Sequence, residues 1–133
     1  MTLDNRKITK ELTNKIKTTS IKTSAASLSS CTLCPRNCKA DRNSGKTGFC
    51  GVDSTIYLAR AALHMWEEPC ISGKKGSGAV FFSGCGLGCC FCQNHDIAIG
   101  SRGLPVTVER LSEIFLELQE KGAANINLVT GTH

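Results

Sequence analysis

Seven of the nine cysteines in this chain of 133 residues form two groups with the short spacings of metal ligands. The first group has the pattern C-x2-C-x3-C-x11-C and comprises Cys31, Cys34, Cys38 and Cys50. The second group has the pattern C-x3-C-x2-C and comprises Cys85, Cys89 and Cys92. Such spacings favour metal ligation over disulfide bonds, and the odd number of cysteines leaves at least one unpaired under any disulfide scheme. The chain is therefore predicted to bind metal in a reducing compartment.

The second group has the ligand number of an iron–sulfur cluster with one open iron. A four-iron cluster held by four thiolates is an electron carrier, whereas three protein ligands leave one iron free to bind another molecule. The same loop carries Gly84, Gly86 and Gly88, which allow positive φ angles and bring backbone N–H groups close to cluster sulfurs. The loop therefore predicts a 4Fe–4S cluster that can activate a bound molecule.

This loop resembles that of the radical S-adenosylmethionine superfamily, in particular an uncharacterised branch similar to pyruvate formate-lyase activating enzymes. The resemblance is carried by Cys-Cys-Phe-Cys-Gln-Asn at residues 89–94 and by residues 59–73, and it runs from about Cys31 to His133. It implies that S-adenosylmethionine chelates the open iron. One electron from the cluster then cleaves the sulfur to 5′-carbon bond, and the resulting 5′-deoxyadenosyl radical abstracts hydrogen.

The resemblance also implies the contacts and partners of such a site. It places Phe91 near the adenine and the segment Thr130, Gly131, Thr132 and His133 near the amino end of S-adenosylmethionine, although relatives usually have proline where this chain has Gly131. No catalytic side chain is predicted. The implied partners are an electron donor such as flavodoxin or ferredoxin and a possible protein substrate, a glycyl radical enzyme. A small-molecule substrate fits equally well.

The four-cysteine group lies in a segment too small for an apolar core, so a metal is expected to hold it together. Tetrahedral zinc and a fully ligated iron–sulfur cluster both fit. We favour the cluster because the neighbouring loop already requires iron. Residues 40–47 match a loose phosphate-binding loop but lie between two ligands with no strand before them, so no nucleotide site is predicted. Cys70 and Cys90 lack ligand spacing; Cys90 is predicted to be structural, and Cys70 to be a buried or half-buried residue.

The apolar segments predict an α/β fold. Residues 55–64 alternate loosely and predict a strand that precedes a barrel, and the apolar run at residues 79–83 predicts a buried parallel strand. A further strand at residues 125–130 completes a β-loop-α-β unit, for which a right-handed crossover is expected. The resemblance identifies this unit as the front part of a partial (β/α) barrel. A complete eightfold barrel needs ~250 residues, so this chain alone is expected to be catalytically impaired.

The helix of this unit is predicted between Thr107, which is its N-cap, and Gly122, which lies just beyond its end. Its predicted core-facing side chains are Val108, Leu111, Phe115 and Leu118.

Residues 1–30 are predicted to form a polar, disordered tail, with a short helix at residues 7–16 as the alternative. A cysteine-rich metal-binding module is predicted at residues 31–52. The resemblance identifies residues 53–133 as the N-terminal part of a radical S-adenosylmethionine domain. Much of the net charge of +5 comes from lysines of the tail that alternate with Thr and Ser, which favours a solvated tail over a nucleic-acid surface. No membrane span or secretory leader is predicted, so the expected location is the cytoplasm. A non-catalytic zinc or iron–sulfur module for binding or electron transfer remains the alternative function.

Overall fold

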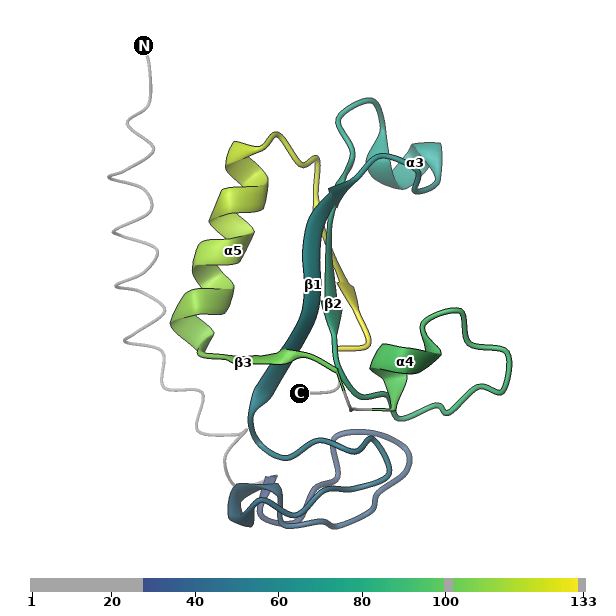
Figure 1. Ribbon diagram of the computed structural model, residues 1–133, viewed down its shortest axis with the longest axis vertical. Helices are drawn as coiled ribbons and strands as arrows, with labels where there is room; N and C mark the ends of the chain where they lie inside the picture. The colour runs from purple at the N-terminus through teal and green to yellow at the C-terminus, as the bar shows by residue number, and fades with distance from the viewer. Residues whose placement is uncertain (1–27, 100–101, 132–133) are drawn as a thin grey trace.

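The computed structural model describes residues 28–99 and 102–131, which form a mixed four-stranded sheet, one long helix and an irregular cysteine-rich lobe at one end of the sheet (Figure 1). The strands are β1 (Ile56–His64), β2 (Ser77–Phe82), β3 (Leu104–Val106) and β4 (Ile126–Val129), in the order β3-β1-β2-β4. The α/β class and the three predicted strands are confirmed. The described strands form an open sheet, and the barrel stays a prediction.

Strand β2 forms the centre of the sheet. It pairs antiparallel with β1 and parallel with β4, and five of its six residues are buried, with only Phe81 half-buried. A strand buried on both faces needs apolar or small residues throughout, which is why β2 consists of a small serine, a glycine, an alanine and large apolar residues. The parallel pairing of β2 and β4 is the pairing that the β-loop-α-β unit predicted.

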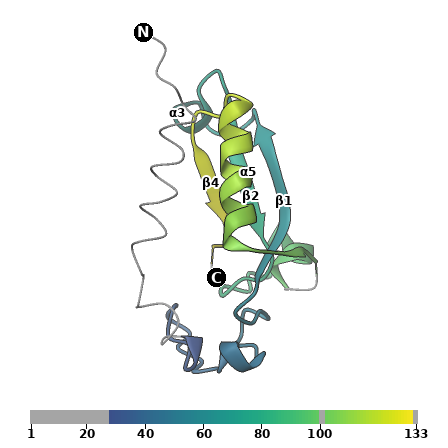
Figure 2. The ribbon, with the colours of Figure 1, turned by 90° about the vertical axis from the view of Figure 1, so that its left-hand side faces the viewer.

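Helix α5 (Val108–Glu120) lies across one face of the sheet (Figure 2). The Thr107 hydroxyl accepts a hydrogen bond from the Arg110 N–H at 3.2 Å, and Gly122 has a φ of 89° just after the helix, so both predicted caps are confirmed. Gly78 allows α5 to pack closely on the sheet, because a Cβ atom there would lie 3.2 Å from Cβ of Leu118 on α5 and 2.7 Å from Cδ1 of Ile126 on the neighbouring strand β4.

The predicted core face of α5 is partly wrong. Ile114 and Leu118 are the buried helix residues and pack against Val80 and Phe82 of β2, with Leu111 and Phe115 beside them. Val108 is instead 61% exposed, because it is the first residue of the helix and burial against the sheet begins only at Leu111.

Strand β3 was not predicted. Its three residues pair antiparallel with residues 56–58 of β1 at the edge of the sheet, in the segment that was expected only to lead into the helix. Proline has no N–H to donate, so within sheets it is tolerated on edge strands, where one side of the strand has no partner, and Pro105 occupies such a strand. A three-residue strand is too short for its alternation to be recognised in the sequence.

Three short helices complete the described chain: η1 (Arg42–Ser44) in the cysteine-rich lobe, α3 (Pro69–Ser72) at the opposite end of the sheet, and α4 (His95–Ala98) after the second cysteine group (Figure 1). Residues 1–27, with the expected tail and short helix, lie outside the described residues. In the described part of the chain, every helix is too short or too polar to cross a membrane.

Candidate metal centres

Backbone hydrogen bonds give the cysteine-rich lobe its shape. The Cys31 N–H donates to the Ala40 carbonyl at 2.9 Å, and the Lys39 N–H donates to the Cys31 carbonyl at 3.0 Å. The buried Arg42 donates from Nε to the Asp53 carbonyl at 2.8 Å and from Nη1 to Cys31 Sγ at 3.9 Å. The lobe therefore has a defined backbone despite its small apolar content.

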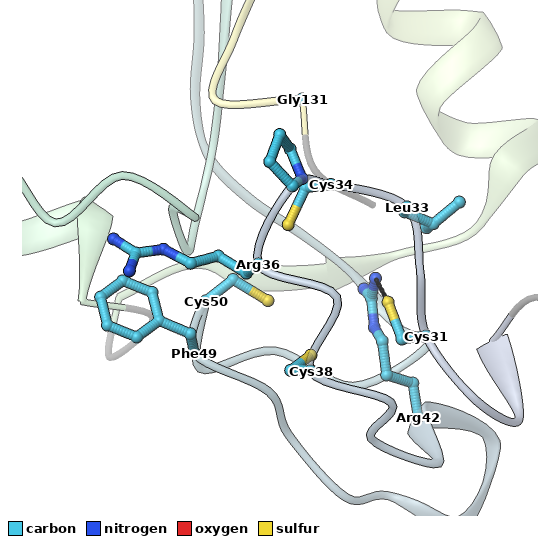
Figure 3. A pocket seen from close by; sticks show the side chains of 10 residues that line it. Cys31, Leu33, Cys34, Arg36, Cys38, Arg42, Phe49, Cys50 and Gly131 are labelled. Atoms are coloured by element: carbon cyan, nitrogen blue, oxygen red, sulfur yellow. Dashed lines mark hydrogen bonds between the residues drawn. The ribbon is translucent and has the colours of Figure 1, made fainter.

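All four cysteines of the first group line one cavity of about 320 Å³. Figure 3 shows their sulfur atoms facing this common space. The other lining residues are Leu33, Pro35, Arg36, Arg42, Phe49 and Gly131. The structure thus brings together the four side chains that the spacing predicted to share a metal.

The pKa of the Cys38 thiol is lowered from its ordinary value. The largest cause is a backbone hydrogen bond from Ala40, and a backbone hydrogen bond from Phe49 acts in the same direction. Because the thiolate is the form that binds metal, these hydrogen bonds favour ligation at Cys38. Thiolates suit both zinc and iron–sulfur clusters, so the chemistry of the four donors fits either metal.

The arrangement of the side chains is a separate matter. Within residues 28–99 and 102–131, no group of three or more His, Cys, Asp or Glu side chains is arranged so that it could hold a metal ion.

The loop with the second cysteine group starts at the carboxyl end of β2. The Ser83 N–H donates to the Tyr57 carbonyl at 2.8 Å, and the Gly84 N–H donates to the Ile97 carbonyl at 2.8 Å. Ser83 Oγ also donates to the Ile97 carbonyl, at 3.2 Å. These bonds join the start of the loop to β1 and to α4, so both ends of the loop are anchored to regular structure.

The three predicted ligands of this loop differ in exposure. Cys85 and Cys92 are half-buried and Cys89 is exposed. Cys85 Sγ accepts a hydrogen bond from the Leu87 N–H at 3.4 Å. Phe91, expected beside an adenine, is 86% exposed. Cys90 is exposed, and Cys70 is exposed as well, contrary to its predicted burial, because the single turn of α3 lies on the surface.

A second cavity, of about 490 Å³, lies between the two cysteine groups. It is lined by Cys34, Pro35 and Arg36 of the lobe, by Cys85, Gly86 and Leu87 of the loop, and by Thr130. Thr130 Oγ1 donates to the Phe82 carbonyl at 2.6 Å, which joins the end of β4 to the end of β2. Cys85 and Thr130, from separate parts of the sequence, thus line the same space, whereas Cys89 and Cys92 are not among its lining residues.

The rest of the predicted terminal segment lies elsewhere. Gly131 lines the four-cysteine cavity, beside Cys34 in Figure 3. Thr132 and His133 lie outside the described residues.

Arg36 is the site residue that spacing did not identify. It lines both cavities, and its guanidinium donates to two backbone carbonyls of the second cysteine loop. The only signal in the sequence is a basic residue between two closely spaced cysteines, which is too common to predict such a contact.

Comparisons with known proteins assign no family. No family model and no solved structure matches the chain. An uncharacterised protein of Methanocaldococcus jannaschii is 29% identical over 108 residues, which cover 76% of this chain and 30% of that protein. The chain therefore spans less than a third of the length of this relative.

Proposed function

We propose that this chain is the front part of a radical S-adenosylmethionine protein similar to the activating enzymes of glycyl radical enzymes. Its 4Fe–4S cluster would be held by Cys85, Cys89 and Cys92, with S-adenosylmethionine bound at the open iron. The observation that carries this proposal is the cavity of about 490 Å³ that Cys85 shares with Thr130. The cofactors would supply a 5′-deoxyadenosyl radical that abstracts hydrogen.

The residues around this cavity would bind and orient the cofactors. The glycines of the loop leave room for backbone N–H groups to approach cluster sulfurs, as the Leu87 N–H approaches Cys85 Sγ. Thr130 has a φ of 58°, an uncommon value for threonine, and its hydroxyl donates to the β2 backbone. This bond holds the turn after β4 against the carboxyl end of β2, where α/β barrels place their chemistry.

We propose a second metal at Cys31, Cys34, Cys38 and Cys50, either an iron–sulfur cluster or zinc. The shared cavity supports either metal. Four thiolates suit either metal, and we favour the iron–sulfur cluster because the proposed cluster of the neighbouring loop would already require iron. An electron donor such as flavodoxin or ferredoxin, a glycyl radical enzyme as substrate, and a cytoplasmic location complete the proposal.

A non-catalytic metal module is the second candidate. It is favoured by one observation, namely that the four thiols of the lobe line one cavity, where they could act as ligands without any bound substrate. In this case the chain would bind zinc or carry electrons, and S-adenosylmethionine would have no effect on its metal.

Anaerobic reconstitution with iron and sulfide separates the two candidates. We expect a brown protein whose reduced EPR signal changes when S-adenosylmethionine is added. The change should disappear in Cys92→Ala and persist in Cys90→Ala, which removes an adjacent exposed thiol that lacks ligand spacing. A colourless zinc protein, or a signal indifferent to S-adenosylmethionine, would refute the radical S-adenosylmethionine proposal.

A further inference from the structure

One peptide group connects Arg36 to Cys85. The Gly86 carbonyl accepts a hydrogen bond from Arg36 Nε at 2.8 Å. The N–H of the same peptide group belongs to Leu87 and donates to Cys85 Sγ at 3.4 Å. Arg36 Nη2 also donates to the Leu87 carbonyl, at 2.9 Å. The guanidinium therefore binds two successive carbonyls and fixes the orientation of the N–H between them.

The cysteine-rich lobe in turn fixes Arg36. This residue lies between Cys34 and Cys38 in the sequence, and its guanidinium carbon is 3.8 Å from the ring centroid of Phe49, which directly precedes Cys50 (Figure 3). Phe49 also faces the other loop, since a Cβ atom on Gly88 would lie 3.1 Å from Phe49 Cζ. The parts of the lobe that carry its thiols are therefore the parts that hold Arg36 in place.

These contacts have an electrostatic consequence at Cys85. A cation bound to a carbonyl polarises the peptide group and strengthens its N–H as a donor. Hydrogen bonds to the sulfurs are among the factors that set the reduction potential of an iron–sulfur cluster. Reduction adds negative charge to the cluster, so a stronger N–H donor and a nearby guanidinium both favour the reduced state.

We infer that Arg36 is a positioning residue that raises the reduction potential of the cluster at Cys85, Cys89 and Cys92, and that it transmits to this cluster the metal state of the four-cysteine lobe. The inference rests on the proposed function, because it requires a cluster at the second cysteine group. Coupling of this kind is reciprocal. A metal that orders the lobe would favour cluster binding by the loop, and a cluster in the loop would favour metal binding by the lobe.

Redox titration followed by EPR tests the first part of the inference. In Arg36→Gln we expect the midpoint of the S-adenosylmethionine-responsive cluster to become more negative by ~59 mV, which corresponds to a tenfold change in a one-electron equilibrium. Arg36→Lys keeps the charge but cannot donate to both carbonyls in the same geometry, so its midpoint should lie between those of Arg36→Gln and the parent chain. The matched control is Lys75→Gln, which removes the same charge from an exposed loop just before β2, at the far end of the sheet.

Metal-free protein gives an independent readout. Hydrogen exchange at residues 86–88 should be faster in Arg36→Gln than in the parent chain, and equally fast in the parent chain and Lys75→Gln. If Arg36→Gln does not fold, Phe49→Leu removes the ring beneath the guanidinium and should change the midpoint and the exchange in the same directions.

A double-mutant cycle tests the coupling to the lobe. Cys38→Ser removes one thiol of the first group and should lower the midpoint in the parent chain but add little in the Arg36→Gln background. Additive shifts would refute the coupling. If the cluster of Arg36→Gln responds to S-adenosylmethionine and its midpoint is unchanged, the inferred role of Arg36 is refuted but the proposed function is not. Absence of any responsive cluster in the parent chain would refute the proposed function together with the inference.

Discussion

A Cβ atom added to Gly84 would lie 2.8 Å from the carbonyl oxygen of Cys50 and 2.6 Å from Cγ1 of Val52. The start of the loop with the second cysteine group thus lies directly against the end of the cysteine-rich lobe. This contact is separate from the Arg36 hydrogen bonds, so the two cysteine segments meet at two places. Because the obstructing Cys50 atom is backbone, it cannot rotate away as a side chain could.

Gly84→Ala is therefore expected to destabilise the protein through both strain and collision. Gly84 has a φ of 90°, and holding a non-glycine residue in a rarely populated backbone region costs ~1–3 kcal/mol. Gly45→Ala is the matched control, because Gly45 has a φ of 80° but nothing within 4 Å of the added Cβ. Urea denaturation of both variants should show a larger loss of unfolding free energy for Gly84→Ala. Equal losses would mean that the collision has no energetic effect.

The core between α5 and β2 gives a second prediction. Leu118 is 2% exposed and packs with Val80, Phe82 and Ile114, so Leu118→Ala should lower the free energy of unfolding by ~2–5 kcal/mol. Leu116 lies on the same helix and is 39% exposed, so Leu116→Ala should cost much less. Chemical denaturation of both variants measures the difference. Similar losses would contradict the observed packing of the helix.

Local sequence signals predicted the elements of this fold better than their contacts. Thr107 and Gly122 were recognised because capping depends on residues within one helical turn. The choice between Val108 and Ile114 as a core residue depends on where the helix meets the sheet, which periodicity does not determine. Cys70 was expected to be at least half-buried because of its residue type, but burial depends on the position of α3.

The same distinction applies to the candidate site. Ligand spacing identified the four cysteines that line the first cavity, because a short segment that binds a metal must carry its donors close together in sequence. Arg36 acts on carbonyls far along the chain, and no local pattern specifies that pairing. The approach of the two cysteine segments is likewise a tertiary contact that only the structure provides.

The thiol of Cys38 leads to a pH prediction for the metal-free protein. Its pKa is lowered by the backbone hydrogen bonds from Ala40 and Phe49, so its thiolate persists to lower pH in the folded protein than in the unfolded chain. The associated stabilisation is present above the unfolded pKa and is lost as the pH falls through the folded pKa. Iodoacetamide reacts with the thiolate. Mass spectrometry of Cys38 alkylation should therefore give a lower midpoint pH in buffer than in urea, and coincident midpoints would contradict the hydrogen bonding.

The last prediction concerns turnover by the 133-residue chain, and it depends on the proposed function. Radical chemistry needs a site that excludes water and competing reactions. Here Leu87, which lines the cavity shared by Cys85 and Thr130, is 72% exposed, and Phe91 is 86% exposed. The matched part covers 30% of the archaeal relative, whose other residues would be available to enclose such a site in that protein. We therefore expect the reconstituted chain, given S-adenosylmethionine and a strong reductant, to form 5′-deoxyadenosine at least tenfold more slowly than the reconstituted archaeal protein.

Quantitative chromatography of 5′-deoxyadenosine measures both rates, with Cys92→Ala of this chain as the background. Equal rates above that background would show that the loop, the lobe and the four strands already enclose the reaction sufficiently.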